Sequence, residues 1–383
     1  MKLNKLFLTS LIGLATLASC GEKSVDPAGD TTVTITDVVG RQVTIDTSKI
    51  NRVICAGAGA LRMYTYGGDL TKLVGVEDID RGVEGANPFA QASRPYYDAN
   101  KELFDSLPSI GIGGPANQKD YDTEKVIAAK PDLIISEFLT LDQTAIEQAT
   151  GAKVVCVSTG SNNVFSDEVK LSLRNLSKIF NNDKGSTVAK YIENSYADLR
   201  AKAKTEDSEK MYVGCLGRWG QQSILSTSPS YPGFQANNIE NIVQGSDLVE
   251  GKIPDLEYLV NKNPTKIILD SAGIGKFKAE YKATTDESYR NVVKQVEAFK
   301  NNEVYLQMPF NAYETNLEIA LANTYYIGSL ANPTAYADFD IAAKTDEITT
   351  KFLGKAMYND IKSKPLSLGG YQKINNFLSW LEE

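Results

Sequence analysis

The sequence predicts an α/β fold built as two lobes with a helical connection. Short apolar runs alternate with segments of helical spacing, a unit of helix, proline and strand occurs twice, and a helical stretch lies between the two copies. With 383 residues, of which 42% are hydrophobic, the chain is long enough for one or two buried cores. Disorder over most of the chain is therefore not expected.

Residues 1–20 have the pattern of an export signal. Two lysines precede an apolar run over residues 6–18, which is shorter than the roughly 20 residues that a membrane-spanning helix needs. The ending LASC resembles a bacterial lipobox, in which Cys20 becomes the lipidated first residue; an ordinary cleaved signal is the alternative. Residues 21–31 are mostly small, polar and turn-forming, which is typical of a tether to a folded body.

A hairpin and five apolar strands predict a first α/β lobe over residues 32–165. The run TVTITDVVGRQVTID alternates apolar and polar residues around a turn at 37–40. Helical spacing follows near 60–67, 122–130 and 142–150. The apolar runs, of the kind buried on both faces of a parallel sheet, lie at 52–57, 73–78, 109–114, 132–137 and 153–158.

An internal repeat predicts the second lobe. EKVIAAKPDLII, which begins at Glu124, aligns without a gap on EYLVNKNPTKII, which begins at Glu257. Each copy reads as a short amphipathic helix that ends at proline, which cannot continue it, followed by a buried strand. We therefore expect a second α/β lobe over residues 207–341, although such units also recur by chance in α/β proteins.

The stretch between the lobes, residues 166–206, predicts a helical linker. Val169, Leu173 and Leu176 fall at helical spacing, and the pattern resumes after a break at 181–185. A helical linker is stiff and permits only small rocking of the lobes. Residues 342–383 predict a helical tail that packs back on one lobe. The predicted architecture is thus two Rossmann-like lobes joined by a long helical linker.

Composition excludes several classes of function. Lys and Arg total 40 against 48 Asp and Glu, a net charge of −8, which argues against a nucleic-acid binder and a polybasic membrane-surface protein. The chain has no His, which excludes Ser-His-Asp and Cys-His nucleophile systems and His-ligated zinc or haem. Apart from Cys20, three Cys lie in β-branched runs without a CxxC pattern, as buried free thiols do. We expect no enzyme, no protein-held metal and no resident cofactor.

The order of several motifs resembles a known family. Several motifs are similar to those of the periplasmic substrate-binding proteins of the iron-siderophore and cobalamin family of ABC importers. They are ITDVVGRQVTID, RVICAG, EKVIAAKPDLIIS, the helical linker, the lipobox and MPFNAYETNLEIALANTYYIGSLANP, which begins at Met308. The resemblance covers most of residues 32 to 360. It implies a ligand cleft between the lobes. It also implies that the protein is a monomer, that only its lipid holds it at the membrane, and that it docks onto an ABC permease and ATPase complex.

The missing His restricts the ligand that this resemblance implies. Manganese- and zinc-binding relatives use His ligands, so here we expect a metal already held in an organic chelate. Three ligands stay open: a ferric chelate of siderophore type, cobalamin or another corrinoid, and haem held by a surface lipoprotein through a Tyr phenolate. Chelatase and nitrogenase-like enzymes share the architecture but need His or clustered Cys. Without His, binding should depend weakly on pH between about 5 and 8.

Loops after strands are the first place to look for the ligand, which in open α/β sheets lies outside the carboxyl ends of the strands. Arg218 and Trp219 offer a guanidinium to an anionic chelate and a flat face to an aryl group, unless Trp219 packs in the core and Arg218 faces solvent. Arg62 follows the strand at 52–57 and is a further candidate. The alternative is that this segment is a plain strand-to-helix turn. Further candidates are Arg94, Tyr97, Tyr231, Phe310 and Tyr313.

The resemblance also implies one acidic residue on each lobe that pairs with Arg of the permease. Glu257, which opens the second copy of the repeat, matches that position in the second lobe. For the first lobe, Glu102 and Asp105 are the candidates. The alternative for each of them is an ordinary solvated carboxylate near a helix end.

Overall fold

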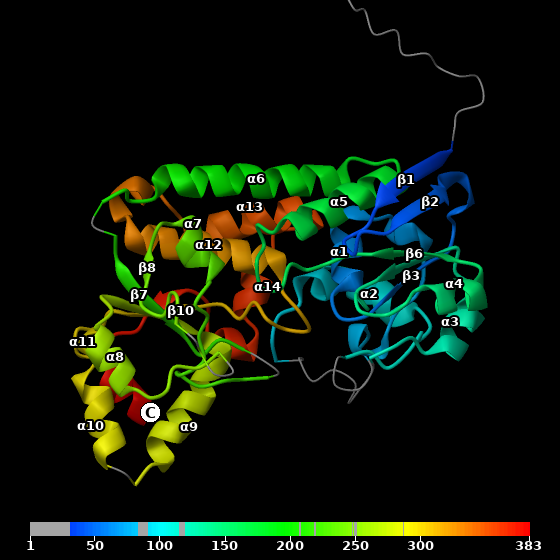
Figure 1. Cartoon of the computed structure of the whole chain (residues 1–383). Helices are drawn as coiled ribbons and strands as arrows, with labels where there is room; N and C mark the ends of the chain where they lie inside the picture. The colour runs from blue at the N-terminus through cyan, green and yellow to red at the C-terminus, as the bar shows by residue number, and fades with distance from the viewer. Residues whose placement is uncertain are drawn as a thin grey trace, which may run out of the picture. The chain divides into compact units, whose positions relative to one another are not determined.

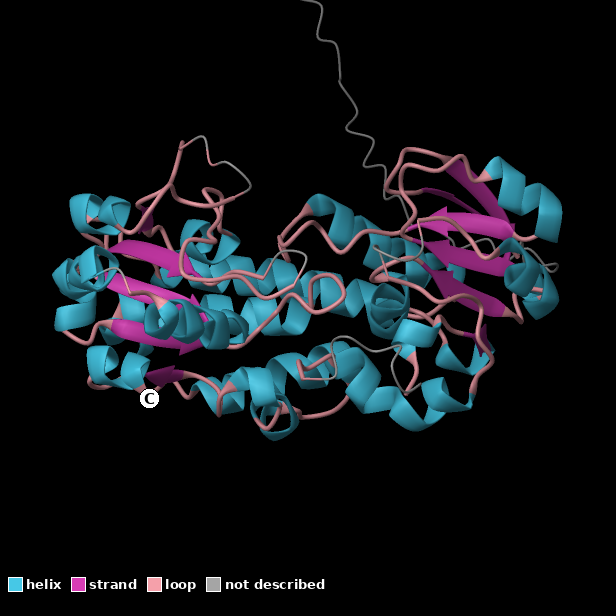
Figure 2. Ribbon diagram, turned by 90° about the horizontal axis from the view of Figure 1, so that it is seen from below, coloured by secondary structure: helices cyan, strands magenta, loops and turns pink. Residues whose placement is uncertain are grey.

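A computed structural model describes residues 31–82, 91–114, 119–206, 208–217, 220–246, 248, 251–285 and 287–383. Residues 32–383 form one compact unit. It contains a hairpin and two further sheets, whose strands are parallel apart from one edge strand, with helices on both sides of each (Figures 1 and 2). The predicted two-lobed α/β fold is confirmed.

The sheet of the first lobe has four parallel strands in the order β4-β3-β5-β6. The predicted hairpin is present and pairs Thr32 with Asp46. The predicted strand at 109–114 is wrong: Ser109 makes a single bridge to Val76, and Gly113 and Gly114 have φ of 71° and 90°, outside the extended region. The strands of this lobe are β1 (Thr32–Thr36), β2 (Gln42–Asp46), β3 (Val53–Ala56), β4 (Leu73–Gly75), β5 (Leu133–Ser136) and β6 (Lys153–Cys156).

Alternate residues of these strands face two different helical layers, as the period of a strand requires. Ile54 and Ile134 pack in one core cluster with Val126 and Ile146 of two short helices. Cys55 and its neighbours on the other face belong to the main core. The helices of the lobe are α1 (Ala60–Gly67), α2 (Pro95–Ser106), α3 (Thr123–Ala129) and α4 (Thr144–Thr150).

The second lobe repeats this plan on a five-stranded sheet of order β11-β10-β9-β7-β8, in which only β11 is antiparallel to its neighbour. Its strands are β7 (Lys210–Gly214), β8 (Glu240–Asn241), β9 (Lys266–Asp270), β10 (Val304–Gln307) and β11 (Gln372–Lys373). Its helices are α7 (Pro232–Ala236), α8 (Glu257–Lys262), α9 (Ile274–Ala283), α10 (Glu287–Gln295) and α11 (Glu297–Lys300).

Both copies of the repeat fold alike. Helix α3 ends at Lys130 and helix α8 at Asn263, each in the left-handed conformation with φ of 48° and 46°. A proline follows directly, and then a strand, β5 or β9, whose Ile-Ile pair is fully buried. The repeat read from the sequence is therefore a true structural repeat.

Two packed helices, α5 (Asp167–Ile179) and α6 (Lys184–Lys202), lie in the chain between β6 and β7. Helix α6 also packs against α12 (Leu317–Ala331) and α13 (Ile341–Leu353), which lie beside it in Figure 1. The chain ends with α14 (Tyr358–Lys362), strand β11 and α15 (Phe377–Glu382). In the part of the chain that the structure covers, no helix combines the length and apolarity needed to cross a membrane.

Three cysteines within the described residues are free and buried: Cys55, Cys156 and Cys215. This confirms the expectation of buried thiols. Burial is the largest cause of a raised pKa at each of them, and for Cys156 the pKa rises to about 12. None of the three thiols is therefore ionised near neutral pH.

Helices α1, α5 and α6 approach each other closely at Gly185, and this contact gives a test of the packing. A Cβ on Gly185 would lie 2.1 Å from the carbonyl oxygen of Leu173. We expect Gly185→Ala to lower the free energy of unfolding by about 1–3 kcal/mol, because the helices must separate. Gly275 in α9 has no atom within 4 Å of such a Cβ.

Gly275→Ala is the matched control and should be neutral or stabilising by up to about 1 kcal/mol. Urea unfolding followed by circular dichroism measures both variants. Equal stabilities of the two variants would contradict the close packing of α5 on α6.

Candidate functional site

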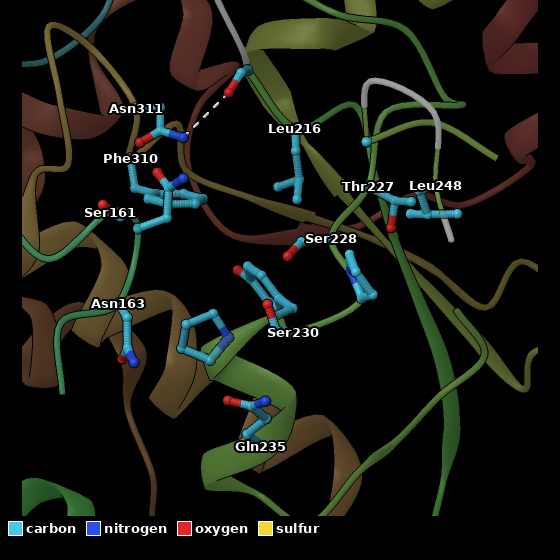
Figure 3. A pocket seen from close by; sticks show the side chains of 16 residues that line it. Ser161, Asn163, Leu216, Thr227, Ser228, Ser230, Gln235, Leu248, Phe310 and Asn311 are labelled. Atoms are coloured by element: carbon cyan, nitrogen blue, oxygen red, sulfur yellow. Dashed lines mark hydrogen bonds between the residues drawn. The ribbon is translucent and has the colours of Figure 1, made fainter. Parts of the chain in front are cut away.

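A cavity of about 530 Å³ lies at the carboxyl ends of strands β7 and β10. Residues 216–217 and 310–311 follow these strands, and residues 227–232 form the loop that enters α7. Residues 161–163, which follow β6 of the first lobe, close another side (Figure 3). Gln235, Leu248 and Gly251 complete the lining. Its position agrees with the rule that ligands of α/β sheets bind beyond the strand ends.

The described residues that line this cavity carry no charged side chain. They offer hydroxyl groups from one threonine and several serines, amide groups from asparagines and Gln235, and the rings of Tyr231 and Phe310. Such a lining forms hydrogen bonds and apolar contacts with a ligand and neutralises no charge. Gly217 of the lining directly precedes Arg218 and Trp219, which lie outside the described residues.

Internal hydrogen bonds fix two of the lining side chains. The Tyr231 hydroxyl donates to Oε1 of Gln307 at 2.8 Å, at the end of β10. Its ring packs edge-on against Phe234, with ring centres 5.2 Å apart. The Asn311 amide donates to the carbonyl oxygen of Gly217 at 3.2 Å, which ties the loops after β10 and β7 together (Figure 3).

The predicted ligand residues lie in two different places, at the cavity and near the carboxyl ends of the first sheet. Tyr231, before α7, and Phe310, after β10, line the cavity. Four others do not belong to its lining and are buried near the carboxyl ends of the first sheet instead: Arg62, Arg94, Tyr97 and Tyr313. Sequence patterns predict where these residues lie in the chain but not the direction of their side chains.

Both of these arginines bind groups of the protein itself. Nη2 of Arg62 donates to the carbonyl oxygen of Ala312 at 2.8 Å, and its guanidinium lies 4.5 Å from the centre of the Tyr96 ring. Arg94 pairs with Asp80 at 3.1 Å. Both arginine side chains are nearly inaccessible to solvent. Burying a charge requires such compensation, so these arginines are held inside the fold and away from the cavity lining.

Two glutamates lie directly after strands of the first sheet. The sequence analysis did not name either of them as a candidate. Glu77 follows β4, where it accepts a hydrogen bond from the Gly57 amide at 3.0 Å and one from the Tyr313 hydroxyl at 2.7 Å. Glu137 follows β5 and accepts two bonds from Thr159, at 2.8 and 3.1 Å. An acidic residue directly after an apolar run, as in LVGVED and DLIISE, was the available signal.

Burial raises the pKa of both glutamates. The pKa of Glu77 rises to about 7, although hydrogen bonds from Gly57 and Tyr313 oppose the shift. The pKa of Glu137 rises to about 8, first by burial and then by the charge of Glu314. Carboxyl groups therefore titrate between pH 5 and 8 in this chain without His. Among the described residues, no three Cys, Asp or Glu are placed to hold a metal ion.

The candidate docking residues differ in accessibility. Glu257, at the start of α8, and Glu102, on α2, are both exposed. Asp105 is half-buried and accepts hydrogen bonds from the Gly82 amide at 2.5 Å and from the Tyr97 hydroxyl at 3.1 Å. These bonds engage Asp105 internally, so Glu102 is the more accessible acid of the first lobe.

Comparison with known proteins identifies the family. The sequence profile of the periplasmic binding proteins matches residues 53–309. The chain belongs to the periplasmic binding protein family. No curated protein matches the chain significantly.

Solved structures of periplasmic binding proteins share the fold at low identity. A TroA-like protein, FepB from Veillonella parvula, is 19% identical with a TM-score of 0.61 over 85% of this chain and 97% of its own. The molybdate-binding MolA of Haemophilus influenzae is 18% identical, with a TM-score of 0.58 over 85% and 98%. Helicobacter pylori CeuE with bound Ni(II) is 15% identical, with a TM-score of 0.52 over 86% and 99%.

The raised pKa values predict a pH-dependent stability. A carboxyl whose pKa is higher in the folded chain than in the unfolded chain, where it is about 4.3, binds protons more tightly when folded. Its contribution to stability is complete below pH of about 4.3 and is lost as the pH rises through the folded pKa. We expect the free energy of unfolding to fall between pH 5 and 8, with Glu77 and Glu137 each contributing up to about 1.4 kcal/mol per pH unit.

Glu137→Gln retains the shape of the protonated side chain and should flatten this fall. Urea unfolding at a series of pH values measures the slope. Glu287→Gln, at an exposed position of α10, is the control and should leave the slope unchanged. An equal slope in wild type and Glu137→Gln would contradict the assignment of the titration to this carboxyl.

Proposed function

We propose that this protein captures a ferric chelate of siderophore type in the cavity beside Tyr231 and Phe310 and delivers it to an ABC permease. The observation that carries the proposal is a cavity of about 530 Å³ whose described lining is hydroxyl, amide and aromatic without a charged side chain. Its volume lies in the range of pockets that bind drug-sized organic molecules, and a single ion would fill a small part of it.

The chemistry of the chain supports a metal that arrives with its own ligands. Free ferric iron requires a set of protein oxygen, nitrogen or sulfur ligands, whereas the chain lacks His and the described lining offers no carboxylate. A chelate satisfies the metal by itself and presents amides, hydroxyls or rings at its surface. The serine, asparagine and glutamine groups of the lining match such a surface by hydrogen bonding.

The second candidate ligand is a corrinoid, which the absence of charge in the described lining also favours. The edge of a corrin ring carries amide groups that would bind hydroxyl and amide side chains. Haem has less support, because the Tyr231 hydroxyl already donates to Gln307 at 2.8 Å.

Direct titration distinguishes these ligands. In a chain from residue 21 onward with Trp380→Phe, Trp219 is the single tryptophan, since the chain has two. We expect a ferric hydroxamate siderophore to quench its fluorescence with saturation at about micromolar concentration or below, and ferric salt alone to give no saturation. Calorimetry with the ferric siderophore, cyanocobalamin and haemin provides the affinities. Saturation by cyanocobalamin alone would replace the iron proposal with the corrinoid one.

Arg218 and Trp219 remain proposed ligand residues because they follow Gly217 of the lining. Replacing either by Ala should weaken binding of the chelate about tenfold or more, as at anchoring contacts in other interfaces. Trp380→Ala, in α15, is the control and should leave the affinity unchanged. An unaltered affinity in Arg218→Ala and Trp219→Ala would remove both residues from the site.

We also propose that lipid on Cys20 attaches the protein to the cell envelope and that Glu102 and Glu257 meet the permease. Cys20 lies outside the described residues. In cells fed a labelled fatty acid, the wild-type chain should incorporate label and Cys20→Ser should incorporate none. Lys5→Ser, which retains Cys20, controls for expression of the altered signal. Equal labelling of the Cys20→Ser chain would overturn the anchor assignment.

A further inference from the structure

Residues 312–318 form a segment of the second lobe, following β10, that binds to the first lobe almost residue by residue. We name it the latch segment. Its first contact is the carbonyl oxygen of Ala312, which accepts from Arg62 at 2.8 Å. The Tyr313 hydroxyl donates to Glu77 at 2.7 Å. These bonds reach the carboxyl ends of the first sheet, where the two lobes meet.

Contacts continue along the latch segment. The same Tyr313 hydroxyl accepts from the Gly114 amide at 3.1 Å. The Thr315 hydroxyl accepts from the backbone amide of Asn162 at 3.1 Å and lies 3.3 Å from its side-chain oxygen. The Asn316 amide donates to the carbonyl oxygen of Ser93 at 3.2 Å. Further on, Glu318 accepts from the Tyr66 hydroxyl.

Most of these contacts are shielded from water; only those to Asn162, which is exposed, are partly buried. Tyr313, Thr315, Asn316 and Glu318 are buried, with at most 3% of any of them exposed. Hydrogen bonds shielded in this way are electrostatically stronger than exposed ones, and breaking them leaves costly unpaired groups. Separating the lobes at this point therefore requires breaking several buried bonds together.

Two turns with unusual backbone geometry meet in this contact. Tyr313 and Glu314 have φ of 52° and 66°, and Ser161 and Asn162 of the first lobe have φ of 48° and 72°. Consecutive left-handed residues other than glycine are energetically costly and persist only where surrounding contacts hold them. The bonds between Thr315 and Asn162 join these two turns directly.

The same two turns border the proposed ligand cavity. Ser161 and Asn162 belong to its lining, and so do Phe310 and Asn311, which lead into the latch segment. A ligand in the cavity would therefore lie beside Ser161 and Asn162 of the first lobe and beside Phe310 and Asn311, which precede the latch segment. Motion of either turn changes the cavity wall as well as the contact between the lobes.

We propose that residues 312–318 are a latch that holds the two lobes together beside the cavity, with Tyr313 and Thr315 as its principal groups. The proposal goes beyond the identity of the ligand and does not depend on it. Release of the latch, through the bonds to Glu77 and Asn162, then lets the two lobes move relative to one another at the cavity wall.

Distance measurements without any ligand test the latch. Ala128 on α3 and Gln295 on α10 are exposed and lie on different lobes, so Cys at both positions can carry spin labels. The native Cys within the described residues are buried and stay unlabelled. Double electron–electron resonance on the chain from residue 21, which contains the whole compact unit, then reports how the two lobes are spaced.

We expect one dominant short distance in the otherwise wild-type chain. Tyr313→Phe and Thr315→Val should each raise the population at longer distance roughly fivefold, since each removes a hydrogen bond between the lobes, a buried one for Tyr313 and a partly buried one for Thr315. Thr324→Val is the matched control, because its hydroxyl donates to the carbonyl oxygen of Ala320 within the same helix, α12. This control should leave the distance distribution unchanged.

Two outcomes would overturn the latch. One is a distribution in folded Thr315→Val that equals the wild-type distribution; the other is a wild-type distribution already as broad as those of the variants. Circular dichroism verifies folding, and if Tyr313→Phe does not fold, Thr315→Val alone decides. Because no ligand is present, failure here leaves the ligand proposal standing, and failure of the chelate titration leaves the latch standing.

Discussion

Burial of charged side chains at the carboxyl ends of the first sheet is the constraint on which the site depends. An unpaired charge inside a protein is costly, so each buried ion must find a partner within the fold. Arg62 and Arg94 are held by Ala312 and Asp80, and Glu77 is held by Gly57 and Tyr313. These charged groups are engaged within the fold, and the described lining of the neighbouring cavity is uncharged.

The repeat accounts for the way both lobes offer loops to one place. In each lobe, a helix that ends in a left-handed residue before proline sets the strand that follows it in a parallel sheet. The parallel strands of a sheet end at a common edge, so the loops after β7 and β10 of the second sheet lie together, and the loop after β6 of the first sheet closes another side of the cavity. The fold thus produces a ligand site without any change in its basic unit.

Sequence patterns predicted most of the fold because local periodicity governs it. The hairpin, four strands of the first sheet, the repeat and the helices α5 and α6 all follow from spacing of apolar residues and from proline. Strand β11 has two residues and no pattern of its own, and Gly113 and Gly114 break the run that resembled a strand at 109–114.

The candidate site was less predictable, because the end of a strand gives a location but no side-chain direction. Tyr231 and Phe310 reach the cavity, whereas Arg62 turns inward to Ala312. The loop serines at 228 and 230 carry no sequence signal, since serine is common in loops of every kind. Contacts between residues far apart in the chain, such as Tyr313 with Glu77, require the tertiary fold.

The buried thiols have a consequence for the life of this protein outside the cytoplasm. Disulfides form readily in the bacterial periplasm, and they do so through an exposed thiolate. Cys55, Cys156 and Cys215 present none, because burial holds each pKa well above neutrality. Once folded, the described body of the chain therefore offers none of these three thiols for disulfide formation.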